Sequence, residues 1–187
     1  VLENSYRAVN IAFIDEWRQF AEAVGIDLFE VIEAIRDRPT HANIRLPGFG
    51  VGGYCLTKDP LFAQAAATAH FDNHDLEFPF CRMALRTNRE MPLRNLSRLE
   101  SELGGSLDGA RLLLLGASYR SGVDDTRFSP SEIFIRAARE RGAKVTVHDP
   151  LVEHWQELAE PVLRELPDPS KFDALVLAVA HDPYRRI

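Results

Sequence analysis

The spacing of apolar residues changes once along this chain, at the glycine-rich segment 104–109. Before it, apolar side chains recur at three- and four-residue steps, the pattern of amphipathic helices. The clearest series is Leu2, Tyr6, Val9, Phe13, Trp17, Phe20 and Val24. After it come short apolar runs, at 111–115, 144–148 and 173–180. The sequence therefore predicts an all-α domain over residues 1–103, a linker over 104–110, and a Rossmann-like α/β domain over 111–187.

Helix-capping and helix-breaking residues predict where the helices of the first domain begin and end. The first helix should end at Gly25, in the position where a helix usually takes a left-handed residue. Asp27 should cap a second, short helix that stops before Pro39. Further helices are expected after Pro60, from Phe78 to Asn88, and, beyond an interruption at Met91-Pro92, to about Leu103. Two asparagines in the first helix, Asn4 and Asn10, are either merely exposed or functional.

The order strand–helix–strand in the second domain predicts right-handed crossovers and a parallel sheet. Helices are expected from a capping box at Ser129 to Arg141, and across 152–158. Ligands bind such sheets at the carboxyl ends of the strands. Here these ends are Gly116–Arg127, Asp149-Pro150 and His181-Asp182. The first turn lacks the GxGxxG dinucleotide fingerprint and instead carries Tyr119 and Arg120, which suit stacking on a base and pairing with a phosphate.

A loop with four glycines, within Pro47–Pro60, leads directly into Cys55. Asp59 is a natural N-cap and Pro60 a natural first helical residue, so Cys55 should lie beside a helix start. Backbone N–H groups and the helix dipole would favour a thiolate there. The alternative is a glycine-rich turn beside an inert, buried cysteine. The long loop also carries cations that either form a solvated rim or bind phosphate, namely Arg38, His41 and Arg45.

Composition narrows the possible functions. The net charge of −6 disfavours a nucleic-acid partner, and no apolar run reaches the length of a membrane span. The cysteines, Cys55 and Cys81, form no disulfide framework or CxxC motif, which favours the cytoplasm and no structural metal. We assign Cys81 to the core and a structural role to His181, and place on the surface His70, His74 and His154. The chain starts inside a helical pattern, so we expect it to be part of a longer protein.

Several segments in sequence order resemble motifs of one enzyme family. They are Glu3–Ala12, the GxGxGGxCxxxDP-like Pro47–Pro60, the RxNxxMP-like Arg86–Pro92, the LGxxYKxxxxDxRxSP-like Leu115–Pro130, and the strand Val145–Pro150. With these, nearly the whole chain resembles the central and C-terminal parts of the UDP-glucose/GDP-mannose dehydrogenase family. The residues of the first two segments resemble most the branch of the family that acts on UDP-N-acetylhexosamines.

The resemblance implies an NAD-dependent nucleotide-sugar 6-dehydrogenase of polysaccharide biosynthesis. Such an enzyme oxidises a C6 alcohol to a carboxylate in two steps, through a cysteine thioester. Cys55 would then be the nucleophile, Asp59 would position or deprotonate water, and Asn4 would donate a hydrogen bond to the developing oxyanion. Arg127 would reach NAD. Substrate contacts are implied for Phe49, Gly52, Gly53, Tyr119, Arg120, His41 and Arg45.

Departures from the family pattern leave alternatives open. The family's N-terminal NAD-binding domain and a lysine that would precede Val1 lie outside this chain, so we expect the chain alone to be inactive. Arg120 replaces a usual lysine, and His41 stands where an arginine normally clamps the diphosphate. The long first helix implies a homodimer or higher oligomer. One alternative is a non-catalytic nucleotide-sugar-binding or assembly module; another is a 2-hydroxyacid or 6-phosphogluconate-like dehydrogenase, which would not need the Cys55–Asp59 pair.

Overall fold

The structure, a computed structural model, describes residues 1–186 and divides into two compact units. The first unit contains residues 1–48 and 55–88. The second contains residues 49–54 and the chain from Arg89 onward. The short segment 49–54 therefore packs with a part of the chain that is remote from it in sequence. Within residues 1–186, no helix combines the length and the apolar character needed to cross a membrane.

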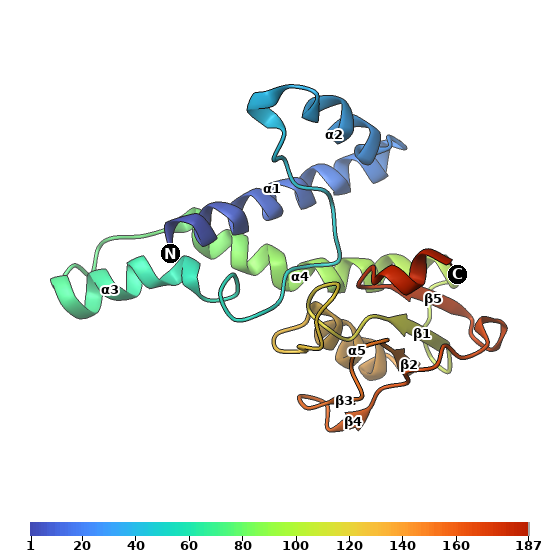
Figure 1. The fold of residues 1–187 in the computed structure, drawn as a ribbon. Coiled ribbons are helices and arrows are strands. Elements are labelled where there is room, and N and C mark those ends of the chain that lie inside the picture. The colour runs from blue at the N-terminus through green and yellow to red at the C-terminus, as the bar shows by residue number, and fades with distance from the viewer. Residues whose placement is uncertain (187) are drawn as a thin grey trace. The chain divides into compact units, whose positions relative to one another are not determined.

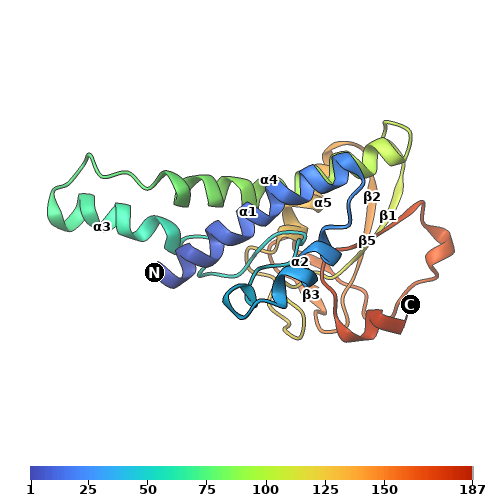
Figure 2. The ribbon, with the colours of Figure 1, turned by 90° about the horizontal axis from the view of Figure 1, so that it is seen from above.

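The first unit is helical, as predicted. Its elements are α1 (Leu2–Val24), α2 (Leu28–Arg36), the short 3₁₀ helices η1 (Pro39–His41) and η2 (Asp59–Leu61), α3 (Phe62–Phe71) and the first part of α4 (Pro79–Glu102). Gly25 ends α1 in the left-handed conformation, with φ 73°. The Asp27 carboxylate accepts hydrogen bonds from the first backbone N–H groups of α2. Both predicted helix boundaries are confirmed, and α2 folds back beside α1 (Figures 1 and 2).

One outer face of α1 is aromatic. Tyr6, Phe13, Trp17 and Phe20, which we call the aromatic stripe, are each about half exposed. The Trp17 ring makes edge contacts with Phe13 and Phe20, at centroid distances of 6.3 and 5.8 Å. The buried residues of α1 lie elsewhere on the helix, and are Ala12, Ile14, Asp15 and Ala21. The predicted apolar series therefore faces outward rather than into the core.

A single helix, α4, runs through Pro92, so the predicted interruption at Met91-Pro92 is wrong. A proline inside a helix removes one backbone hydrogen bond and introduces a steric clash. Met91 and Leu96 on either side of it are almost completely buried. Packing of these side chains offsets the local cost of the proline.

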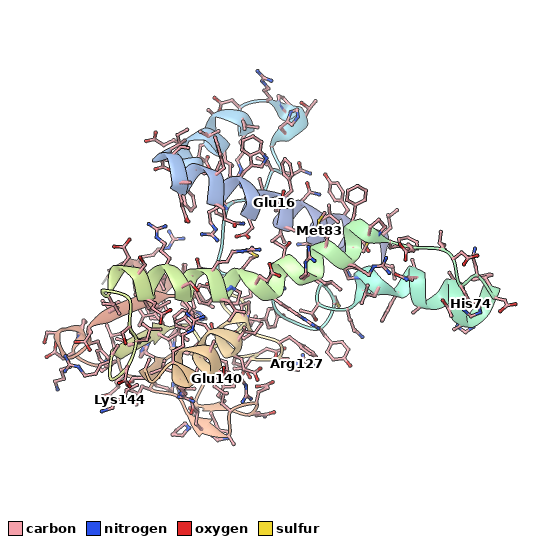
Figure 3. All side chains as sticks on the ribbon, turned by 180° about the vertical axis from the view of Figure 1, so that it is seen from behind. Glu16, His74, Met83, Arg127, Glu140 and Lys144 are labelled. Atoms are coloured by element: carbon pink, nitrogen blue, oxygen red, sulfur yellow. The ribbon has the colours of Figure 1, made fainter. Side chains whose placement is uncertain are left out.

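The predictions for Cys81 and three histidines are confirmed. Cys81 is buried near the start of α4, while His74 lies in the loop that precedes the helix (Figure 3). His74, His70 and His154 are all exposed.

The second unit contains a parallel sheet in the order β2-β1-β5, which confirms the predicted Rossmann-like layout (Figure 1). Its elements are β1 (Arg111–Leu115), α5 (Pro130–Glu140), β2 (Lys144–His148) and β5 (Ala174–Leu177). The central strand β1 is buried from Leu112 to Leu115. Phe134 of α5 packs into the same core, which also takes in Leu107 from the predicted linker.

The predicted helix over 152–158 is wrong. The segment instead forms a strand, β3 (His154–Trp155), that pairs antiparallel with β4 (Glu160–Pro161). The sequence suggested a polar helix here, but so short a helix has little stability of its own. The hairpin buries Val152 and Trp155 in the core of the unit and leaves Leu158 partly buried against it. Burial of these apolar side chains in the core favours the hairpin over a helix exposed to solvent.

Candidate active site

Two of the predicted catalytic residues are directly hydrogen-bonded. The Asn4 side-chain Nδ2 donates to Asp59 Oδ2 at 2.7 Å, and both side chains are partly buried. Asn4 lies in the first turn of α1, and Asp59 opens η2, which packs against α1. An asparagine amide has two N–H donors, so a second one remains for another acceptor. Asn4 therefore contacts a residue remote in sequence, whereas Asn10 donates to the Tyr6 carbonyl of its own helix; a functional role for Asn4 stays a prediction.

Cys55 is exposed, which argues against an inert, buried thiol. The backbone N–H groups of Lys58 and Asp59 donate to the Cys55 carbonyl at 3.3 and 2.9 Å. This helical turn fixes the separation between Cys55 and Asp59. It also means that these two donors serve the carbonyl, so stabilisation of a thiolate by nearby N–H groups stays a prediction.

The expected N-cap role of Asp59 is wrong. Asp59 is the first residue of the 3₁₀ helix η2, whose N-cap is Lys58, and α3 begins only at Phe62. The residue before α3 makes no side-chain capping hydrogen bond. The carboxylate of Asp59 is instead held by Asn4. A long-range hydrogen bond has therefore replaced the local capping contact that the sequence suggested.

Gly52 and Gly53 pack closely against other parts of the second unit, Gly52 against the Phe128 backbone and Gly53 against the Tyr119 ring. A Cβ on Gly52 would lie 2.5 Å from the Phe128 carbonyl oxygen and 2.7 Å from Tyr119 Cβ. A Cβ on Gly53, which has φ 78°, would lie 3.0 Å from the Tyr119 ring. The Gly53 N–H donates to the Arg127 carbonyl at 3.0 Å. The missing side chains thus let segment 49–54 dock on the loop after β1, and Phe49 extends this docking with a ring contact to Phe134 at 5.4 Å.

A buried acid holds the turn that carries Tyr119 and Arg120. The Asp149 carboxylate accepts backbone N–H bonds from Ala117 and Ser118, at 2.8 and 3.0 Å, and from Leu151 and Val152. His181 Nε2 lies 3.2 Å from the same carboxylate and 3.0 Å from Ser118 Oγ. His181 has the structural role predicted for it. The Asp-Pro signal after β2 marked the position of Asp149, but not its role in fixing this turn.

The two arginines of this loop differ in their partners. Arg120 is exposed and forms no ion pair with any residue in the described part of the chain. Arg127, at the surface of the loop (Figure 3), pairs with Asp125 through several hydrogen bonds, one of them 2.6 Å long. The hydrogen bond from the Arg127 side chain lowers the pKa of Asp125, despite a smaller opposing effect of burial. Arg120 is therefore the more available cation for a phosphate.

The described residues provide few contacts that could bind NAD. Gly116, which opens the turn after β1, is required by packing, because a Cβ there would lie 2.5 Å from Val179 Cβ. No further glycine follows before Gly122 to make a dinucleotide turn. Arg127 is the one side chain that the sequence assigned to NAD, and it is exposed and held in one orientation by Asp125. These features suit a supporting contact to NAD. No group of His, Cys, Asp and Glu suited to a metal ion occurs in residues 1–186.

The cations of the long loop lie in the first unit. His41 Nδ1 is 2.9 Å from the hydroxyl of Thr40 and the ring is exposed, while Arg45 is partly buried. Arg36, which the sequence did not single out, donates twice to the Ile44 carbonyl, at 3.2 and 2.8 Å. It therefore fixes the loop just before Arg45. The predicted roles of His41 and Arg45 in holding a diphosphate stay predictions.

Two family models match successive parts of the chain. The model described as the central domain of the UDP-glucose/GDP-mannose dehydrogenase family matches residues 1–90. The model described as the UDP binding domain of the same family matches residues 113–187. The matched ranges contain the motif segments on which the resemblance is based, except for the last two residues of Arg86–Pro92.

Individual relatives agree with this assignment. A UDP-N-acetyl-D-mannosamine dehydrogenase from Pyrococcus horikoshii is 32% identical over 100% of this chain and 42% of its own length. The crystal structure of an NDP-N-acetyl-D-galactosaminuronic acid dehydrogenase from Methanosarcina mazei matches with a TM-score of 0.87 and 29% identity, over 100% of this chain and 41% of that one. A UDP-glucose dehydrogenase structure from Pyrobaculum islandicum matches with a TM-score of 0.82 and 30% identity, over 98% and 43%.

The chain thus spans about two fifths of the length of these relatives, which are nucleotide-sugar dehydrogenases by name. The shared segment contains a helical domain followed by a parallel-sheet domain, with the motif residues placed as described above. This chain belongs to the UDP-glucose/GDP-mannose dehydrogenase family, of which it carries the central domain and the UDP binding domain.

Proposed function

We propose that the whole protein is a cytoplasmic, NAD-dependent nucleotide-sugar 6-dehydrogenase. It oxidises the C6 alcohol of a nucleotide sugar, preferably a UDP-N-acetylhexosamine, to a carboxylate. The observation that carries this proposal is the 2.7 Å hydrogen bond between Asn4 and Asp59, one turn from the exposed thiol of Cys55. This is a nucleophile, an acid–base group and a polar donor gathered in one unit.

Cys55 divides the oxidation of the aldehyde into two easier steps, formation of a thioester and its hydrolysis. Two molecules of NAD, bound mainly outside this chain, would serve as the hydride acceptors, one for the alcohol and one for the thiol adduct of the aldehyde. After the first transfer the substrate is an aldehyde, and the Cys55 thiolate adds to its carbonyl carbon. Loss of the second hydride from that carbon leaves a thioester. Water then adds to the thioester, the carbon–sulfur bond breaks, and the products are the carboxylate and the free Cys55 thiolate with release of protons.

Asp59 and Asn4 act on the oxygens of these intermediates. Asp59 is placed to accept a proton from the attacking water, because its carboxylate is only partly buried and its orientation is fixed by Asn4. Asn4 uses one N–H on Asp59 and has a second N–H to donate to the oxyanion formed on thiolate or water attack. One side chain thereby orients the base and stabilises developing charge.

The second unit supplies the binding of the nucleotide. Tyr119 offers a partly exposed ring to the base, and Arg120 offers a phosphate a guanidinium that forms no ion pair with the residues that the structure describes. Asp149 and His181 hold the turn on which both residues lie. Gly52 and Gly53 of segment 49–54 lie against Tyr119, and Phe49 packs on Phe134 in the core of the same unit. Arg127 adds a contact to NAD.

The test is the intact mass of the full-length protein, quenched during turnover with NAD and one of three sugars. The sugars are UDP-N-acetylmannosamine, UDP-glucose and GDP-mannose, and an Asp59→Asn background slows hydrolysis. We expect a covalent adduct with one sugar that disappears in Cys55→Ala and persists in Cys81→Ala, since Cys81 is a buried thiol. The chain of 187 residues by itself should form no NADH. Nucleotide-sugar binding without any adduct or NADH would instead identify a binding module.

We also propose that two copies pair through the aromatic stripe of α1. A row of half-exposed aromatic rings on a helix of 23 residues is self-complementary, because a twofold axis places the same face on both subunits. We expect Trp17→Glu to turn a dimer or larger oligomer into a monomer in light scattering. Glu16→Gln, a change beside the stripe, should leave the mass unaltered. A monomeric wild type would rule out this interface.

A further inference from the structure

The two ring nitrogens of His181 contact different parts of one turn. His181 follows β5, is 2% exposed, and belongs to the second unit, as do all its partners. Its Nε2 lies 3.0 Å from Ser118 Oγ and 3.2 Å from Asp149 Oδ2. Its Nδ1 lies 3.4 Å from the backbone nitrogen of Gly122. The ring therefore spans the turn that carries Arg120.

These contacts assign the proton of the His181 ring. The Gly122 N–H can only donate, so Nδ1 must offer it a lone pair. A neutral imidazole with a free Nδ1 carries its proton on Nε2. That N–H is directed at Ser118 Oγ and the Asp149 carboxylate, both of which can accept it. A ring protonated on both nitrogens would instead turn an N–H towards the N–H of Gly122.

Ser118 connects His181 to Arg120. The Ser118 Oγ accepts from His181 Nε2 and donates to the Arg120 carbonyl at 3.0 Å. Two residues after Arg120, the Gly122 N–H is held by His181 Nδ1. Ser118 is completely buried, whereas Arg120 is exposed. His181 thus fixes the main chain on both sides of Arg120 and leaves its side chain accessible.

The surroundings of His181 keep the ring in place. Tyr184 meets it edge to face, with ring centroids 5.8 Å apart, and the Tyr184 hydroxyl donates to the His148 carbonyl at 2.9 Å. Burial lowers the pKa of the His148 imidazole, whose Nε2 lies 3.1 Å from the Arg164 carbonyl. Asp149 is the charged group in direct contact with the His181 ring. Because these contacts are internal to the unit, they preorganise the turn for binding.

We propose that His181, with its proton on Nε2, is a positioning residue for Arg120 in nucleotide binding. Through Ser118 it fixes the Arg120 carbonyl, and through Nδ1 it fixes the chain that follows. The Arg120 guanidinium then leaves the turn in one direction and pairs with a phosphate of the nucleotide sugar. His181 itself touches no substrate. This inference rests on the proposed function, in which Arg120 binds that phosphate.

The first test is calorimetric binding of UDP to the full-length protein and its variants. Ser118→Ala removes the link to Arg120, and His181→Asn keeps an acceptor near the Nδ1 position while losing the Nε2 donor. We expect each to raise the Kd about 2- to 12-fold, the effect of one hydrogen bond. The KM for the nucleotide sugar should rise with it, while kcat stays within about twofold of wild type. His154→Asn, the same change at an exposed histidine of this unit, should leave both unaltered.

A double-mutant cycle distinguishes positioning from general stabilisation. Once Arg120→Ala has removed the guanidinium, Ser118→Ala should raise the Kd little further. Multiplicative losses in this double variant would overturn the proposal. So would a lower denaturation midpoint with an unchanged Kd in the folded Ser118→Ala and His181→Asn proteins, since that is the result of a purely structural role.

The tautomer gives a second test, which uses the wild-type protein. NMR of the full-length protein with isotopically labelled histidine should show the His181 ring protonated on Nε2 and unprotonated on Nδ1 at neutral pH. A proton on Nδ1, alone or together with one on Nε2, would overturn the proposal. Failure of wild type to bind UDP, or a Kd that Arg120→Ala leaves unchanged, would instead defeat the proposed nucleotide site. The two failures are therefore distinguishable.

Discussion

Replacing Gly52 with alanine should undock segment 49–54. Gly52 is buried and its φ lies outside the left-handed region, so the cost of the substitution is steric alone. The new methyl would lie 2.5 Å from the Phe128 carbonyl oxygen and 2.7 Å from Tyr119 Cβ. Neither atom can rotate away, because one belongs to the backbone and the other is bonded to it. Overpacking of this kind costs about 1–3 kcal/mol.

The hydrogen bond from Gly53 N–H to the Arg127 carbonyl gives a direct assay for this docking. If docking weakens by about 1–3 kcal/mol, exchange of that amide hydrogen should speed up by about 5- to 150-fold, measured by NMR. Gly48→Ala is the matched control, because a Cβ there would have no neighbour within 4 Å. Its exchange rate at Gly53 should equal that of wild type. A Gly52→Ala protein whose Gly53 amide exchanges at the wild-type rate would refute the docking argument.

Three further predictions concern the polar network. Asn4→Ala should lower kcat about 10-fold or more, because Asp59 loses a charge-assisted hydrogen bond, while Asn10→Ala should leave steady-state kinetics unchanged. Asp149→Asn should destabilise the second unit by more than ~3 kcal/mol in denaturant titrations, since its buried carboxylate accepts several backbone N–H bonds. Hydrogen bonds from Arg111 lower the pKa of Asp173 from 3.8 to about 2. The contribution of this pair to folding stability should therefore be complete above about pH 4 and be lost as the pH falls towards 2. Arg111→Gln should return the pKa of Asp173, measured by NMR, towards 3.8.

Local signals in the sequence were enough for much of the fold. Gly25 and Asp27 act within a few residues, so the end of α1 and the start of α2 followed from residue type. The parallel sheet followed from the order of its segments. Pro92 was misleading because its cost is offset by buried neighbours that no local rule includes. The hairpin at β3 and β4 was missed because the burial of Val152 and Trp155 in the core of the unit is not visible in the local sequence.

The candidate site was predictable in its residue types but not in its contacts. The spacing of Cys55 and Asp59, and the polar Asn4 in the first helix, were visible in the sequence. The Asn4–Asp59 hydrogen bond joins residues 55 positions apart, which no local pattern can reveal. The glycines were expected to approach a sugar, yet their closest neighbours are Tyr119 and Phe128. Phe128 itself lay in a recognised motif, but only its torsion angle identified it as unusual.

The chain passes from the second unit to the first at the Tyr54–Cys55 peptide bond. Tyr119 and Arg120, proposed to bind the base and a phosphate, belong to the second unit, and the proposed catalytic residues belong to the first. A glycine-rich loop before a nucleophile is usually taken as a source of flexibility. Here Gly52 and Gly53 are buried, and each is tightly apposed to another part of the backbone or to a ring. The glycines make the segment more firmly held than larger residues would allow, because the absence of side chains permits this close packing. Variants that loosen the segment should for this reason lose activity before they lose the fold.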